Sequence, residues 1–269
     1  MLHAGTTRWT IGAIELTRVA DPDFELVLPQ DEATAALLKA TPWLCPEFVT
    51  EEQELRIGSS AICVRTPSAT IVVDPFLAFD DPARLAPRLA ALRAAGVDPD
   101  EVDVVVNTHI DGIGANVRAD GEPAFGRARY LLPGAELDDA RAGIHGEEGA
   151  SLAHLFDEGR LEAVAAGGQL VPGIRLEEVG GHSRGHVVVW VESGGARAVI
   201  VGHLFLHPAQ IANPDADNGD VDPGALLRAR RALLARCVRD DVILVGPLFA
   251  APGGGRVRQD GGSWRLQLL

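Results

Sequence analysis

The chain has 269 residues, 46% of them hydrophobic, and a formal net charge of −14. This length and apolar content allow a large buried core. The acidic balance argues against nucleic acid and anionic membranes as partners, because both would be repelled. The three cysteines, Cys45, Cys63 and Cys237, form no CxxC pair, which argues against a disulfide framework and a thiolate zinc site.

We expect no signal peptide and no membrane span. No basic start followed by a long apolar stretch opens it, and no run approaches the ~18 apolar residues of a membrane span. We therefore expect a soluble, cytoplasmic protein that acts on a small molecule. No linker rich in glycine, serine or proline divides the sequence, so residues 1–269 are predicted to form one domain. The apolar content leaves room for a homodimer.

Apolar periodicity and turn residues predict alternating strands and helices in the first half. Strands are expected at residues 9–19, 54–66, 69–76, 101–109 and 128–133. Helices are expected at residues 81–97, 135–143 and 147–159. Asp81 is the expected N-cap of the first helix, and Gly96 its C-cap.

The second half repeats this alternation. Strands are expected at residues 174–181, 185–193, 196–203 and 241–249. A helix is expected at 222–238, with Asp222 as its cap, and the glycine-rich stretch 251–262 is expected to be a loop between strands. This order of elements favours a two-sheet core with helices outside.

Three histidines stand at the point where an apolar strand stops. His109 ends "VDVVVNTH", His182 follows "IRLEEVGG", and His203 follows "ARAVIVG". Strand ends hold ligands and catalytic groups rigidly while the adjoining loops leave room for substrate. The pattern therefore indicates a candidate tridentate imidazole metal site. The alternative is that each histidine is solvated in its loop or bonded to a backbone carbonyl.

Two further residues adjoin these histidines. Asp111 follows His109 by two residues and could face the same centre, or it could cap the next turn, as aspartate before glycine often does. His186 opens a strand within a glycine turn and is interpreted as structural.

Over nearly the whole chain these segments resemble the metallo-β-lactamase-fold hydrolases, most closely the branch related to acyl-homoserine-lactone lactonases. "ATIVVDPF" is similar to the strand of that fold that ends in a fixed aspartate, and "VDVVVNTHIDGIGAN" resembles its first metal loop. "GGHSRGH", "AVIVGHLFLHPAQ" and "VILVGPLF" resemble the later metal segments. The resemblance implies an α/β fold, an αββα sandwich of two mixed β-sheets with outer helices.

The metal ligands of that family are incomplete here. Its motif H-x-H-x-D-H is shortened to "THIDGIGAN", in which Asp111 matches either the second histidine or the aspartate. Gly112 stands where the last histidine of the motif is usual, His203 replaces the aspartate that bridges two metals, and Leu248 replaces a final histidine. The resemblance therefore implies at most a mononuclear site and not a dinuclear zinc centre.

Two kinds of enzyme fit these residues. In the first, His109, His182 and His203 hold one zinc or iron ion, with Asp111 as fourth ligand or general base, and the substrate is a small ester, lactone or thioester. In the second, no metal binds, and the same residues act as acid–base groups in a cyclisation, elimination or isomerisation of a natural-product intermediate. A non-catalytic binding protein is a third hypothesis. We favour the first, because His203 is still a good ligand.

Four residues are expected in the walls of a substrate pocket. Trp43 and Phe205 would give apolar contact, and His207 would shape a wall. Arg184 stands where the family motif has proline and could meet a carboxylate or an enolate.

Overall fold

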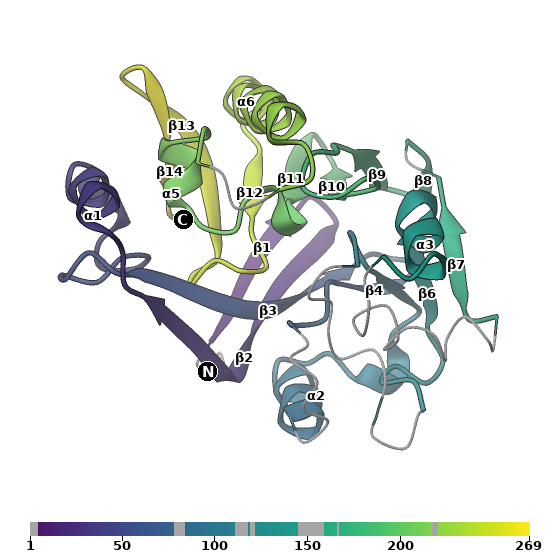
Figure 1. Cartoon of the computed structure of the whole chain (residues 1–269). Coiled ribbons are helices and arrows are strands. Elements are labelled where there is room, and N and C mark those ends of the chain that lie inside the picture. Colours follow the sequence, from purple (N-terminus) through teal and green to yellow (C-terminus); the bar gives the residue numbers. More distant parts are fainter. Residues whose placement is uncertain are drawn as a thin grey trace.

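The computed structural model describes residues 5–77, 84–110, 118, 122–144, 159–165, 167–216 and 220–269. Within these ranges the strands form two sheets of seven (Figure 1). The first sheet has the order β1 (Thr6–Ile11), β2 (Ile14–Leu28), β3 (Leu55–Arg65), β4 (Thr70–Val73), β5 (Val104–Val106), β6 (Arg129–Pro133) and β7 (Leu161–Val164). The second has the order β14 (Ser263–Gln267), β13 (Gly254–Asp260), β12 (Ile243–Val245), β11 (Ala196–Ile200), β10 (Val187–Ser193), β9 (Ile174–Glu178) and β8 (Gln169–Val171).

Helices flank these sheets (Figure 1). The α-helices are α1 (Glu32–Lys39), α2 (Leu85–Ala94), α3 (Gly134–Arg141), α5 (Ala209–Ala212) and α6 (Pro223–Arg239). Short 3-10 helices lie at η1 (Pro42–Leu44), η3 (Pro99–Glu101) and η4 (Gly202–Leu204). None of the helices in the described ranges is long and apolar enough to cross a membrane.

Three apolar layers follow from side chains that alternate along the strands. Ile71 and Val73 of β4 pack between the two sheets, whereas Val72 faces α2. On β10, Val189 and Val191 face the first sheet, and Trp190 packs with the side chains of α6. Each sheet is therefore buried on both faces over this region, and the predicted sandwich of two mixed sheets with outer helices is confirmed.

Parallel pairing brings the ends of neighbouring strands to one edge of the first sheet. Val73 of β4 lies opposite Val106 of β5, which lies opposite Leu131 of β6. The backbone N–H of Asp74 donates to the carbonyl of Val106 at 3.0 Å, one residue beyond the end of β4. The residues after β4 and β5 therefore lie side by side, close to the second sheet.

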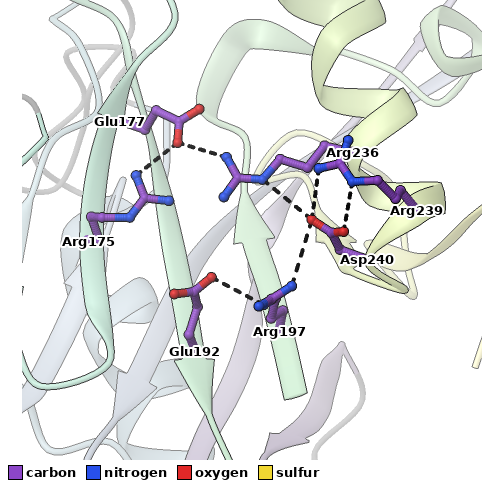
Figure 2. A network of polar contacts seen from close by, with 7 residues as sticks. All are labelled: Arg175, Glu177, Glu192, Arg197, Arg236, Arg239 and Asp240. Atoms are coloured by element: carbon purple, nitrogen blue, oxygen red, sulfur yellow. Dashed lines mark hydrogen bonds and ion pairs between the residues drawn. The ribbon is translucent and has the colours of Figure 1, made fainter. Parts of the chain in front are cut away.

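Helix α6 is fixed to the outer face of the second sheet by arginines and one buried tryptophan. The guanidinium of Arg236 lies 3.8 Å from the ring centroid of Trp190 on β10. Glu177 of β9 accepts hydrogen bonds from Arg175 at 2.8 Å and from Arg236 at 2.9 Å, within the network of Figure 2. These ion pairs are partly exposed, so each contributes little to stability. We expect the stacking of Arg236 on Trp190 to contribute more to the attachment of α6 than either ion pair.

The N-terminus of α6 is capped as predicted. The carboxylate of Asp222 accepts from the N–H of Ala225 at 2.9 Å, which satisfies one of the unpaired donors of the first turn. The N–H of Asp222 also donates to the carbonyl of Gly181 at 2.8 Å. The start of α6 is thereby tied to the segment that carries His182.

Two predicted elements differ from the structure. Residues 9–19 form a hairpin of β1 and β2 instead of one strand, because Gly12 turns the chain with a φ of +58°. The glycine-rich stretch 251–262, expected to be a loop, contains strand β13. Its glycines permit this pairing, since a side chain at Gly255 would meet the carbonyl oxygen of Gln267 at 2.3 Å.

Other predicted elements differ from the structure at their ends, and α1, β7, β8, α5 and β14 were not predicted. The strand expected at 101–109 is reduced to β5 and preceded by η3, and the helix expected at 81–97 is observed as α2. Its predicted cap, Asp81, lies outside the described residues, as does nearly all of the helix expected at 147–159.

Candidate metal centre

Three imidazoles from three separate segments converge at the edge of the sandwich. His109 follows β5 of the first sheet, while His182 follows β9 and His203 lies in η4 after β11, both of the second sheet. The ring centroid of His109 lies 4.9 Å from that of His182 and 4.2 Å from that of His203. One ligand atom of each residue lies within 4.8 Å of the others. Across the ranges that the structure describes, this is the one group of three or more His, Cys, Asp or Glu side chains with such spacing.

A buried hydrogen-bonded chain orients His109. The hydroxyl of Thr108 donates to Asp74 at 2.8 Å, so its lone pair accepts from Nδ1–H of His109 at 2.9 Å. This tautomer leaves Nε2 of His109 deprotonated, as a metal ligand must be. Burial raises the pKa of the Asp74 carboxyl to about 6, against the lowering effect of its two hydrogen bonds from Thr108.

Asp220 orients His182 in the same way. Its Oδ1 lies 2.7 Å from Nδ1 of His182, and its side chain is 1% exposed. The next residue, Val221, donates its N–H to the carbonyl of His182 at 3.3 Å. A carboxylate on the far nitrogen of a ligand histidine fixes the ring and raises its basicity. The sequence analysis did not identify Asp220, which lies 38 residues from His182 in a loop before α6.

An Asp220→Asn substitution is expected to weaken zinc binding about 10-fold to 100-fold, because the ring of His182 loses its charged partner while the shape of the site is kept. Competition with a chromophoric chelator measures this affinity. Zinc affinity equal to that of the wild type would show that Asp220 does not act on the metal through His182.

His186 lies beneath the cluster. It is fully buried, its ring centroid lies 4.9 Å from that of His109, and its Nε2 accepts the backbone N–H of His203 at 3.0 Å. Burial, reinforced by the nearby His182 and His203, lowers the pKa of His186 well below its ordinary value. His186 is therefore a neutral support for the η4 turn, in line with its structural interpretation.

The donor set suits a divalent cation such as zinc or iron. Two of the rings have a hydrogen-bond partner, His109 in Thr108 and His182 in Asp220, and the backbone N–H of His203 is bound by His186. His109 is 1% exposed and His203 9% exposed, so the cluster is shielded yet retains access to solvent. Three neutral imidazoles with an open remaining position are a known ligand set for catalytic zinc.

The remaining predicted site residues lie elsewhere or outside the described ranges. Asp111 and Gly112 are outside them. Arg184 has a side chain that is 58% exposed and forms an ion pair with Asp139 at 3.3 Å. Phe205 is fully buried in the core beneath α6, where Arg230 lies 5.6 Å from its ring centroid, and Trp43 packs against the same core. A role of these three side chains in substrate binding stays a prediction.

His207 is part of the core framework and also lines a cavity. Its Nε2–H donates to the carbonyl of Phe48 at 2.8 Å, and its Nδ1 accepts the N–H of Ala209 at 3.0 Å. Both ring nitrogens are thus satisfied only when the imidazole is neutral. Burial lowers the pKa of His207 to about 4, against the raising effect of the Phe48 carbonyl.

This titration predicts a loss of stability in acid. The unfolded chain protonates His207 near pH 6.5 and the folded chain only near pH 4, so protons bind preferentially to the unfolded state. The free energy of unfolding should therefore fall by about 3 kcal/mol between pH 6.5 and pH 4 because of this residue. Urea titrations of the wild type and of His207→Gln across this range measure the effect. Parallel pH profiles for the two proteins would contradict it.

The cavity beside His207 has a volume of about 600 Å³. It lies between α1, the start of β3 and the segment that follows η4, and Leu206 and His207 of that segment line it. The other apolar walls come from the side chains of Leu28, Leu37, Leu38, Leu44, Leu55 and Ile57. Its size and apolar lining are typical of a small-molecule pocket.

Comparisons with known proteins agree with this geometry. The sequence profile of the family described as the metallo-beta-lactamase superfamily matches residues 56–112, from β3 to the segment after His109. AidC, a dizinc quorum-quenching lactonase in complex with a product, superposes with a TM-score of 0.82 at 16% identity, over 98% of this chain and 97% of its own. The chain is a metallo-β-lactamase-fold protein.

Other proteins of this fold are similar to the chain. AbOPH, a hydrolase of the beta-lactamase superfamily, has a TM-score of 0.81 at 19% identity, over 100% of this chain and 99% of its own. An N-acyl homoserine lactone hydrolase with N-hexanoyl-L-homoserine at its catalytic metal centre has a TM-score of 0.62 at 16% identity, over 90% and 94%. A search of curated protein sequences finds no match. At these identities the structural likeness establishes the fold and leaves the reaction open.

Proposed function

We propose that this metallo-β-lactamase-fold protein is an enzyme with one metal ion, held by His109, His182 and His203, that acts on a small ester, lactone or thioester. The convergence of three imidazole ligand atoms within 4.8 Å carries the proposal. The three rings come from three segments, and the rings of His109 and His182 are each oriented by a hydrogen-bond partner. Loop histidines without a shared function would not need this arrangement.

A divalent cation bound here would supply Lewis acidity for a carbonyl oxygen. The chain's own residues orient the ligand rings and exclude bulk water. Thr108 and Asp74 keep Nδ1 of His109 protonated, and Asp220 does the same for His182, so that both rings present their other nitrogen to the centre. The low exposure of His109 and His203 excludes bulk water and strengthens the electrostatic interactions in the site. Asp111, two residues beyond His109, is our candidate for fourth ligand or general base.

A single ion is proposed because the second site lacks its ligands. Gly112 has no side chain to coordinate a metal, and Leu248 is a 6% exposed apolar residue in place of a histidine. His203 offers an imidazole, and each imidazole nitrogen binds only one ion, whereas a carboxylate can share two. The proposed site would thus differ from the dizinc centre named for AidC.

One observation favours a metal-free alternative. The 2.7 Å contact between Asp220 and His182 is the arrangement that orients a histidine for general acid–base catalysis. On this reading His182 would move a proton in a cyclisation, elimination or isomerisation of a natural-product intermediate, and the neighbouring rings would bind substrate.

Turnover of a panel of aryl esters, γ-lactones and acyl thioesters distinguishes the metal-dependent enzyme from the metal-free alternative. The protein is assayed as purified, after dialysis against a chelator, and after reloading with one equivalent of zinc or ferrous ion. We expect chelation to abolish hydrolysis of at least one class, and reloading to restore it. Hydrolysis that is unchanged in demonstrably metal-free protein would exclude the metal-dependent function.

A further inference from the structure

A buried carboxylate that the sequence analysis did not single out joins the two histidine loops. Glu136 lies in the first turn of α3 and is 0% exposed. Its Oε2 accepts the backbone N–H of Ile110, the residue after His109, at 3.2 Å. Its Oε1 accepts the backbone N–H of Gly185 at 2.7 Å, one residue before His186. The same carboxylate therefore binds the His109 segment of the first sheet and the 182–186 loop of the second.

The packing around Glu136 is close on the side of the 182–186 loop. A Cβ at Gly185 would lie 3.0 Å from the backbone N of Glu136 and 3.1 Å from its Cγ. Glycine thus lets the loop approach the first turn of α3 closely enough for the 2.7 Å hydrogen bond. Hydrogen bonds from backbone N–H groups to a buried carboxylate are stronger than those between neutral groups.

From this geometry we propose that Glu136 is a positioning residue, which sets the distance between the His109 and His182 imidazoles by holding their loops together. Each loop leaves a different sheet, and the 4.9 Å separation of the two rings depends on how those loops meet. The hydrogen bonds that tie Glu136 to the two loops come from backbone N–H groups, so the proposed effect acts through the backbone on both sides. The effect on metal binding rests on the proposed function, whereas the effect on the two loops does not.

A Glu136→Gln substitution tests this directly. It preserves the shape but replaces one of the two acceptor oxygens by an NH₂ group that faces an N–H donor. In the wild type we expect slow hydrogen exchange at the amides of Ile110 and Gly185. In the variant we expect exchange at these two amides to accelerate at least ~10-fold relative to the amides of β10, and the ring ¹⁵N shifts of His109 and His182 to change. Zinc affinity, measured by chelator competition, should fall ~10-fold to 100-fold.

Asp21→Asn is the matched control. Asp21 is another buried carboxylate, 4% exposed, but it binds Arg88 at 2.7 Å instead of the histidine loops. This variant should lower the melting temperature without changing the ring shifts or the zinc affinity. If Glu136→Gln fails to fold, Gly185→Ala replaces it, because the added Cβ separates the loop from α3 and should produce the same changes.

The outcomes separate the two proposals. Unchanged exchange and ring shifts in a folded Glu136→Gln or Gly185→Ala variant would overturn the positioning role, as would equal changes in Asp21→Asn. Wild-type protein that binds no zinc would refute the proposed metal site, while the exchange rates and ring shifts would still decide whether Glu136 holds the loops together.

Discussion

Replacing His182 by alanine is expected to abolish metal binding and to lower metal-dependent turnover by at least ~10³-fold. The substitution removes one of three imidazole ligands and also leaves the buried carboxylate of Asp220 without its ring partner. The two remaining imidazoles, even with Asp111 as a further ligand, form a less complete site than the wild type. Elemental analysis of the purified variant and steady-state kinetics on the best substrate of the panel measure the two effects.

His207→Gln is the control for this experiment. His207 is also a buried histidine, 2% exposed, but it binds Phe48 and Ala209 and does not belong to the imidazole cluster. Its substitution should leave the metal content unchanged at neutral pH. If His182→Ala retains the metal content of the wild type, the three histidines are not the ligands.

The second large effect is expected at Gly202. This residue precedes His203, has a φ of +52°, and would place a Cβ 2.6 Å from both Nε2 of His186 and Oγ1 of Thr108. Those two side chains support His203 and His109, so Gly202→Ala disturbs both at once. We expect the free energy of unfolding to fall by about 3 kcal/mol or more, from the left-handed backbone and the overlap together. Zinc affinity should fall at least ~10-fold. Chemical denaturation and chelator competition measure these changes.

Gly261→Ala separates the cost of the left-handed backbone from the cost of the steric overlap. Gly261 has a similar φ of +57°, but a Cβ there would meet nothing within 4 Å. This variant should lose only the ~1–2 kcal/mol of the left-handed conformation and keep its metal affinity. An equal loss of stability in Gly202→Ala and Gly261→Ala would mean that His186 and Thr108 move aside without energetic cost. These two side chains would then not hold the site in place.

The sequence predicted the layers of the fold because its strands are apolar on both faces. Runs such as Val187–Val191 and Val104–Val106 can be buried only between two other layers, and this requirement leads to a sandwich. The hairpin at Gly12 was missed because "WTIGAIELTRV" keeps its alternation through the turn. Strand β13 was missed because glycines dominate its start, although close pairing with Gln267 requires them there.

The site was predictable where it depends on strand ends. His109, His182 and His203 each follow an apolar run, and parallel or adjacent strands bring such ends together. Asp220 and Glu136 carried no such signal. Asp220 lies in a loop and Glu136 in helix α3, and only the tertiary fold brings them to the histidine segments. Phe205 and Trp43 were expected in a pocket from their apolar character alone. The structure buries Phe205 in the core and packs the half-buried Trp43 against it, so their contact with a substrate stays a prediction. The prediction for Asp111 stays open, since it lies outside the described residues.

The central claim is a single metal ion in a three-imidazole site. The most direct test is the zinc content of untagged protein after incubation with excess zinc and removal of unbound ion, determined together with the protein concentration. We expect about one equivalent, bound by three histidines, with the fourth position open or occupied by Asp111. Two equivalents would mean that a second set of ligands exists despite Gly112, His203 and Leu248. No bound zinc and no bound iron would mean that the imidazole cluster serves acid–base chemistry instead.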